Sequence, residues 1–213
     1  GAWSGYSPAL AFEYNSTAQL AASGKLPEAV SNGSLALRLA PLAARAGVTG
    51  KYVKKATLNF HNNKRGKHIN TPPLVWSQEA AAHAKQWATQ QVAKCDGQSW
   101  DGWFKHSSGS KFGENLGASM GSMGGSWKAF KAAKQSMKGW YGEIKNWNFG
   151  SSSSNGGVTG HFTQMVWKST TKVGAYVAVK DLGGGKKCVM YVANYHAPGN
   201  YVGQYSNNVK KRA

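Results

Sequence analysis

Two neighbouring segments near the C-terminal end, VGAYVAVK at 173–180 and KCVMYVANY at 187–195, constrain the fold most strongly. Both are rich in β-branched and aromatic residues, and both are apolar at nearly every position. They are joined by DLGGGK, a turn-forming sequence that predicts two antiparallel strands. A strand that is apolar on both sides needs cover on both faces of its sheet. The two segments therefore predict a sheet buried between two other layers.

Two segments with helical periodicity precede these strands. SQEAAAHAKQWATQQVAK at 77–94 predicts a helix capped by Ser77, and SWKAFKAAKQSMKGWYGEI at 126–144 predicts a second one. Because the helices come first and the strands follow, the pattern predicts an α+β fold. We expect a three-layer α–β–α sandwich with a mainly antiparallel central sheet.

The chain divides by composition into three parts. Residues 1–52 are rich in Ala, Ser, Gly and Leu, and they predict an N-terminal extension with a short helix interrupted at Pro41. A pro-segment, a spacer and a packed extension all fit this composition. We expect residues 53–206 to form the folded domain and residues 207–213 to form a basic tail.

Several features favour an exported protein. The N-terminus lacks a basic-then-apolar leader, so we expect any signal peptide to have been removed, and no apolar run is long enough to span a membrane. Asn15 and Asn32 fit the N-glycosylation pattern. Cys95 and Cys188 can form one disulfide that closes a long loop, although two buried thiols are also consistent. We therefore expect a secreted protein.

The formal charge of +18 is unevenly placed. Residues 1–50 hold Lys25, Arg38 and Arg45 against Glu13 and Glu28, a net of +1, so the rest carries 18 − 1 = +17. Such a surface favours anionic partners such as a membrane surface or acidic cell-wall glycans. No RNA- or DNA-binding motif is present, so nucleic acid is not an expected partner.

Acidic side chains are rare, and two of them stand in contexts that could carry chemistry. Glu114 in FGENLG and Glu143 in GWYGEI form a candidate set with His106 and His161. Two imidazoles and two carboxylates can bind a divalent metal or perform acid–base work. No short ligand motif joins the four positions, so four separately hydrogen-bonded residues are the alternative.

The segment GHFTQMVWKST at 160–170 resembles the first signature of the CAP superfamily, which comprises cysteine-rich secretory, antigen 5 and pathogenesis-related proteins. YVANYHAPGNYVG at 191–203 resembles the second signature, and HSSGSKFGENLG and WYGE match the blocks between them. The resemblance covers residues 55–206 and is closest to the fungal secreted members.

The resemblance implies an α–β–α sandwich and implies that the four candidate residues line one cavity. His106, Glu114, Glu143 and His161 match the family's cavity tetrad, whose two histidines can hold zinc or magnesium. Ala193 stands where the second signature usually has a cysteine, so the family's disulfide pattern does not transfer to this chain.

The same resemblance favours lipid binding. WYGEIKNWNFG corresponds to an aromatic loop to which sterol binding is attributed in related proteins, and it supplies Trp140, Tyr141, Trp147 and Phe149. Trp140 and Tyr141 also fit a helix core, whereas Trp147 and Phe149 are expected to form an exposed apolar patch.

The expected function is that of a secreted CAP protein that binds a sterol or a fatty acid. One alternative is an effector or defence protein that acts through its basic surface. The other is a metal-dependent hydrolase with Glu114 or Glu143 as base, which is less expected because catalytic zinc normally has three protein ligands.

Overall fold

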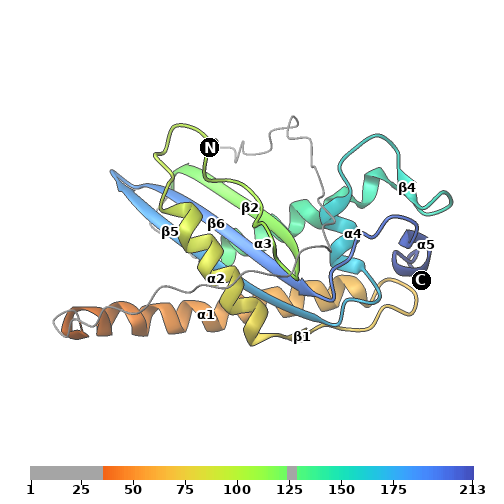
Figure 1. The fold of residues 1–213 in the computed structure, drawn as a ribbon, viewed down its shortest axis with the longest axis horizontal. Coiled ribbons are helices and arrows are strands. Elements are labelled where there is room, and N and C mark those ends of the chain that lie inside the picture. The colour runs from red at the N-terminus through yellow and green to blue at the C-terminus, as the bar shows by residue number, and fades with distance from the viewer. Residues whose placement is uncertain (1–35, 124–128) are drawn as a thin grey trace.

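The computed structural model describes residues 36–123 and 129–213, and before Gly50 it describes the backbone only (Figure 1). Along the chain its elements are α1 (Ala36–Arg65), β1 (Val75–Trp76), α2 (Gln78–Val92), β2 (Gly113–Ser122), α3 (Ala129–Gly142), the 3-10 helix η1 (Glu143–Asn146), β3 (Trp147–Asn148), β4 (Ser153–Ser154), α4 (Gly160–Val166), β5 (Lys172–Gly183), β6 (Lys186–His196) and α5 (Tyr205–Asn208). In the described part of the chain, no helix is both long enough and apolar enough to cross a membrane.

The main sheet has the strand order β1-β5-β6-β2. The two segments predicted as strands are β5 and β6, which pair antiparallel as expected, and β2 pairs antiparallel with the outer side of β6. β1 pairs in parallel with β5, and Val75 N–H donates to Thr171 O at 3.0 Å. The sheet is therefore mixed, which corrects the expectation of a mainly antiparallel one. The short strand between α1 and α2 joins the sheet in the direction of β5, and the composition of β5 and β6 could not show this.

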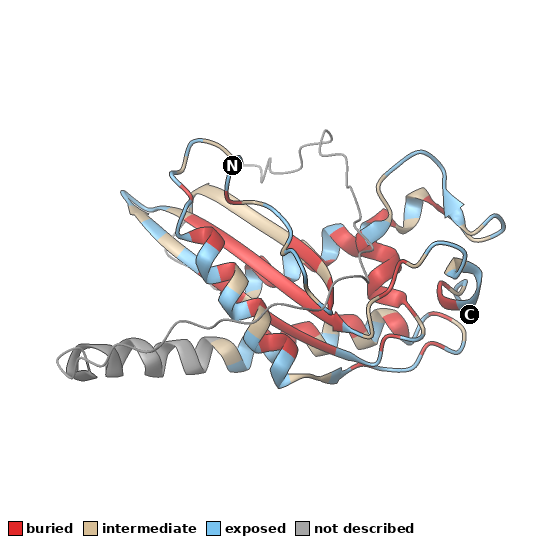
Figure 2. Ribbon diagram, viewed as in Figure 1, coloured by how far each residue is buried: buried red, intermediate tan, exposed pale blue. Residues whose placement is uncertain are grey.

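Both faces of the sheet are covered, as the two-sided apolar strands predict. On β6, Tyr191 and Tyr195 pack on the side of α1 and α3, while Cys188, Met190 and Val192 pack on the side of α2. Strand β6 is buried along most of its length and β5 mainly in its first half, with helices in front of and behind them (Figures 1 and 2). The mixed α+β fold thus has two cores, one on each face of a single sheet.

Helix α2 begins where the sequence predicts. The Ser77 hydroxyl oxygen accepts from Ala80 N–H at 3.1 Å, which satisfies one of the free amides at the start of the helix. Beyond its last turn, Lys180 Nζ of β5 donates to Ala93 O at 2.9 Å and Cys95 O at 2.7 Å. Both ends of α2 are therefore fixed, and its buried alanines let it lie close against β5 and β6.

Helix α1 departs from the expected pattern. It runs without interruption through Pro41, so the expected break is wrong: the proline removes one hydrogen bond in the second turn without ending the helix. It also crosses the position between residues 52 and 53 at which we placed the domain boundary. Val53 is already part of the core. The two glycosylation candidates, Asn15 and Asn32, lie outside the described residues.

The C-terminal residues lie against the domain. Val209 is buried, and its N–H donates to Tyr205 O at 2.7 Å at the end of α5. Beyond it, Ile69 N–H donates to Lys211 O at 3.1 Å. The segment predicted as a basic tail is thus held by backbone hydrogen bonds to the loop that follows α1.

Candidate functional site

The four tetrad residues come from four separate segments and form two histidine–glutamate pairs. His161, in the first turn of α4, pairs with Glu143 at the start of η1, and we call these two the inner pair. His106, in the loop between α2 and β2, pairs with Glu114 near the start of β2, and we call these two the outer pair. The structure therefore brings each histidine to one of the two predicted glutamates.

In the inner pair, Glu143 both orients the histidine and caps a helix. His161 Nδ1 lies 2.6 Å from Glu143 Oε1, while Oε2 accepts from the N–H groups of His161 at 3.0 Å and Phe162 at 3.1 Å. These amides lie in the first turn of α4, where a carboxylate satisfies free donors and favours the helix dipole. The Trp140 ring stacks on the imidazole at a centroid distance of 5.8 Å. The inner histidine thus has its ring plane and its Nδ1 fixed.

The outer pair repeats this arrangement on a loop. His106 Nδ1 lies 2.8 Å from Glu114 Oε1, which also accepts from Ser107 N–H at 2.9 Å. The Ser107 hydroxyl donates to Glu114 Oε2 at 2.9 Å. Although the Glu114 side chain is only 6 % exposed, His106 is 44 % exposed. The outer histidine therefore faces solvent over a buried carboxylate.

A buried hydrogen-bonded chain supports the inner pair from behind. Asn115 Nδ2 donates to His161 O at 3.1 Å and to the Tyr195 hydroxyl at 3.2 Å. That hydroxyl lies 2.8 Å from His61 Nε2, and His61 Nδ1 donates to Thr57 O at 2.9 Å. Burial lowers the pKa of His61 to about 4 and raises the pKa of Tyr195. Both groups are thus neutral near pH 7. The chain of hydrogen bonds connects α1 to α4.

Sequence reasoning missed His83 as a neighbour of the outer pair. Asn194 lies opposite Glu114 in the β2–β6 ladder. In the orientation that satisfies the Asn194 amide, Asn194 Nδ2 donates to Glu114 Oε2 at 3.3 Å. Asn194 Oδ1 then accepts from Ala84 N–H at 3.2 Å and from His83 Nδ1 at 2.7 Å. The only signal in the sequence was that His83 falls on the same face of its helix as Ala80 and Ala84, which are both buried. A third histidine is thereby linked to Glu114 through one amide.

The same reasoning missed Arg65, which holds the segment after α4. Its guanidinium is buried and donates to the carbonyl oxygens of Pro72, Met165, Trp167 and Thr170 at 2.7 to 3.0 Å. Burial lowers its pKa to about 10, so it remains charged at neutral pH. No sequence motif marks an arginine whose partners are all carbonyl oxygens.

The arrangement partly fits the divalent ion that the family resemblance implies. Each imidazole has its Nδ1 on a carboxylate, as in the carboxylate–histidine–metal arrangement of metalloproteins, so Nε2 would be the ligand atom. Within residues 36–123 and 129–213, no three His, Cys, Asp or Glu side chains gather as a metal site. Each histidine can therefore offer one ligand atom, and any ion held there would need water for its other ligands.

The aromatic residues predicted to bind lipid lie deeper than expected. Trp140 and Tyr141 are buried in α3, in agreement with the helix-core alternative. Trp147 is only 6 % exposed and packs on Tyr205, and the half-buried Phe149 packs on Phe162. The expectation of an exposed apolar patch at Trp147 and Phe149 is therefore wrong. The short β3–β4 hairpin folds both side chains inward against α4 and α5.

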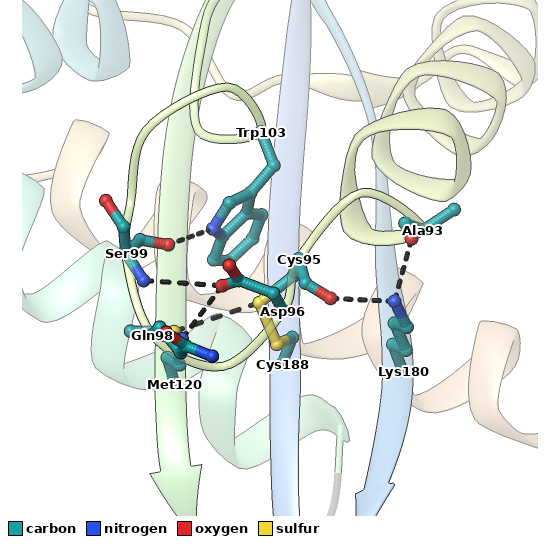
Figure 3. Close-up of a disulfide and its surroundings, with 9 residues drawn as sticks. All are labelled: Ala93, Cys95, Asp96, Gln98, Ser99, Trp103, Met120, Lys180 and Cys188. Atoms are coloured by element: carbon teal, nitrogen blue, oxygen red, sulfur yellow. Dashed lines mark hydrogen bonds between the residues drawn. A yellow bond between two sulfur atoms is a disulfide. The ribbon is translucent and has the colours of Figure 1, made fainter.

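Cys95 and Cys188 form a disulfide between the end of α2 and β6, which confirms the predicted bond over that of two free thiols (Figure 3). Both cysteines are fully buried. Trp103 is buried in the same apolar cluster and donates its indole N–H to Ser99 O at 2.8 Å (Figure 3). The loop that carries His106 is thus anchored to the centre of the sheet at its beginning.

Comparison with known proteins agrees with this arrangement. The family model of the Cysteine-rich secretory protein family, CAP, matches residues 58–195. The chain belongs to the CAP family. Its relatives include Protein PRY2 of Saccharomyces cerevisiae, 34% identical over 155 residues, which cover 71% of this chain and 39% of PRY2. They also include the basic form of pathogenesis-related protein 1 of Nicotiana tabacum, 31% identical over 147 residues, which cover 69% of this chain and 71% of that protein.

Solved structures show the same fold. BmVAL-1 superposes with a TM-score of 0.55 at 22% identity, covering 72% of this chain and 78% of that one. NaASP2, whose crystal structure is described with Zn2+, superposes with a TM-score of 0.52 at 22% identity, covering 76% and 86%. The CAP fold therefore extends over about three quarters of this chain.

Proposed function

We propose that this CAP protein is extracellular and binds a small hydrophobic lipid that has one polar head group, with a sterol as the first candidate and a fatty acid as the second. The name of its family and those of its relatives, which include a salivary antigen-5 of Dipetalogaster maximus, support the extracellular assignment. The binding segment is the aromatic stretch from Trp140 to Phe149, and Trp147 is its central residue.

One observation carries this proposal. The indole N–H of Trp147 is buried and has no hydrogen-bond partner among the described residues. Burying an unpaired donor costs about 1–3 kcal/mol, so such groups are rare in folded proteins. A sterol hydroxyl or a fatty-acid carboxylate would supply the missing acceptor. The Tyr205 ring packs on both Trp147 and Trp167, and these rings offer the flat apolar surface that suits a sterol.

The β3–β4 hairpin is the element that can open to admit a ligand. Its two strands have two residues each and pair only with one another, outside the main sheet. The residues of its turn and those after β4 are mostly exposed and rich in Gly and Ser. Apart from Trp147 and Phe149, its residues are mostly exposed, so the packing of these two side chains is what opposes local opening of the hairpin. Lifting the hairpin would expose the aromatic surface beneath Trp147 and Phe149.

Variants of Trp147 test the lipid site. Trp147→Phe keeps an aromatic ring but removes the N–H, and we expect it to weaken cholesterol binding about tenfold while unfolding stays within about 1 kcal/mol of the wild type. Trp147→Ala with Phe149→Ala should abolish binding. Trp100→Phe, on the other side of the sheet, is the matched control and should bind as the wild type. Unchanged binding by both Trp147 variants would refute the assignment of this segment.

We also propose that His106 and His161 can hold a divalent ion, Zn or Mg. The support is the bond from each Nδ1 to a glutamate, which fixes ring orientation and raises the basicity of Nε2. When bound, the ion would supply a positive charge and exchangeable water at the histidines. We do not extend this proposal to hydrolysis, because a catalytic zinc normally has three protein ligands.

A further inference from the structure

The C-terminal segment and the loop after α1 form a short two-stranded contact. His68 and Arg212 pair as an antiparallel bridge, flanked by the bonds Ile69 N–H to Lys211 O and Ala213 N–H to Lys67 O, each 3.1 Å long. His68 Nδ1 donates to Lys210 O at 2.5 Å. Backbone hydrogen bonds thus fix the place of residues 210–213, although their side chains are mostly exposed.

This contact gathers cations from three parts of the chain. We call them the C-terminal basic cluster: Lys64, Lys67, Lys168, Lys210, Lys211 and Arg212. Lys168 joins it because its N–H donates to Asn208 O at 2.9 Å. Lys64 Nζ and the Arg212 guanidinium lie 4.5 Å and 5.7 Å from the centroid of the same Tyr141 ring. Burial lowers the pKa of Lys64, and the charges of Lys67 and Arg212 lower it further.

Among the described residues, no Asp or Glu side chain forms an ion pair with the cluster. That part of the chain has six acidic side chains, and each is engaged elsewhere: Glu79 with Lys111, Asp181 with Lys187, Glu114 with His106, Glu143 with His161, Asp96 with the N–H groups of Gln98 and Ser99, and Asp101 with Ser99. The fold therefore holds six cations together without an Asp or Glu partner among these residues. Charge complementarity calls for an anionic ligand with several negative groups.

A shallow open pocket of about 530 Å³ lies at the cluster. It is lined by Gly66, His68, Asn70, Thr71, Pro72 and Lys168. Its volume is in the range of small-ligand pockets, and its lining offers one lysine with amide and hydroxyl groups that can bond to sugar hydroxyls. The pocket and the cluster together offer both neutral hydrogen-bonding groups and positive charge.

We propose that the C-terminal basic cluster and its pocket bind an acidic polysaccharide. Single-stranded nucleic acid fits less well, because base stacking needs exposed aromatic rings and Tyr141 is buried beneath two cations. A membrane surface fits less well, because insertion needs exposed apolar side chains next to the charges. The large apolar side chains exposed in the described part are Tyr52, Val75, Val179 and Val202, and none of them lines the pocket. The proposal does not rest on lipid binding.

The test titrates the full chain with oligogalacturonate of defined length, with neutral dextran as the control polymer. We expect saturable binding to oligogalacturonate that weakens steeply as salt rises, and none to dextran. Lys67→Gln with Lys168→Gln and Lys211→Gln should lower the affinity about tenfold or more. The matched variant Lys85→Gln, Lys94→Gln and Lys186→Gln removes the same charge from α2, the loop after it and the start of β6, and should lose no more than about twofold.

Several results would overturn the proposal. Equal losses in the two triple variants would show a general effect of net charge, and no loss in the first would remove the cluster from the site. Tighter binding of a single-stranded oligonucleotide, or of phosphatidylserine vesicles, at the same salt would contradict the assignment to polysaccharide. Acetylation of the wild-type protein gives a check without mutation: bound oligogalacturonate should protect Lys67, Lys168 and Lys211 but not Lys85, Lys94 and Lys186.

Discussion

The inner and outer pairs make the same hydrogen bonds at different depths. In both, a glutamate binds the histidine Nδ1 and also accepts from backbone N–H groups of the histidine's own segment. In the inner pair the side chains of His161 and Glu143 are 10% and 3% exposed, whereas His106 of the outer pair is 44% exposed.

The difference lies in what surrounds each histidine. His161 is held by the cap of α4, by Trp140 and by the chain through Asn115 to α1. His106 lies on a loop held by the disulfide at its beginning, by the Trp87 indole N–H of α2, which donates to Lys105 O at 2.9 Å, and by Glu114 at its end. The comparison teaches that the same two residue types have different main roles in the two pairs. In the inner pair they mainly stabilise the packing of α4, and in the outer pair they form an accessible site.

The largest expected effect comes from removing the disulfide. Cys95→Ala with Cys188→Ala should lower the free energy of unfolding by about 4 kcal/mol, because the bond closes a loop of 93 residues. Hydrogen exchange should rise in the loop of His106 much more than in α4. Equal increases in both segments would show that the two pairs do not differ in their attachment.

Acid should weaken the support of the inner pair. The folded-state pKa of His61 is about 4, against 6.5 ordinarily, so the unfolded chain binds more protons between these values. Stability from His61 is therefore complete above about pH 6.5 and is lost as pH falls towards 4, by about 3 kcal/mol. Urea unfolding at pH 7, 5.5 and 4 measures it. His61→Gln should flatten this slope, and an unchanged slope would contradict the assignment.

Isosteric substitutions compare the two glutamates directly. Glu143→Gln should lower the free energy of unfolding by about 2 kcal/mol, because the backbone amides of α4 lose a charged, buried acceptor. Glu114→Gln should cost about 1 kcal/mol, because its histidine is partly solvated. Urea unfolding at neutral pH gives both values. A larger loss for Glu114→Gln would reverse our interpretation of the pairs.

Metal binding should change stability by an amount similar to that of the Glu114→Gln substitution. Zinc at ten times its dissociation constant should raise the free energy of unfolding by about 1.4 kcal/mol. His106→Ala and His161→Ala should each remove this increase, since each pair supplies one ligand. His196→Ala is the control, an exposed histidine at the end of β6, and should retain it. An increase that survives in His106→Ala with His161→Ala would disprove the proposed ligands.

The sequence predicted elements whose cause is local. Continuous apolar runs specified β5 and β6, and Ser77 marked the start of α2. The CAP signatures selected both histidines and both glutamates, but residue spacing could not show that they form two pairs. The pairing depends on where α4 and the loop before β2 come to lie, which is set by tertiary packing.

Other features left no local signal. Trp147, among polar and glycine residues, resembled an exposed loop side chain, yet the β3–β4 pairing turns it onto Tyr205. The basic C-terminal residues resembled a free tail, yet they are held by backbone atoms, which carry no side-chain signature. Arg65 is satisfied by carbonyl oxygens in the same way. Residue types alone do not predict hydrogen bonds that are made by the backbone groups of distant segments.

Direct binding of labelled cholesterol to the purified chain tests the central claim. It should be measured beside a labelled fatty acid and a sample treated with a chelator. We predict saturable cholesterol binding that the chelator leaves unchanged, because the lipid is proposed to contact Trp147 and Phe149, whereas the ion would be held by His106 and His161. Absence of binding by both lipids, with and without the chelator, would contradict the account.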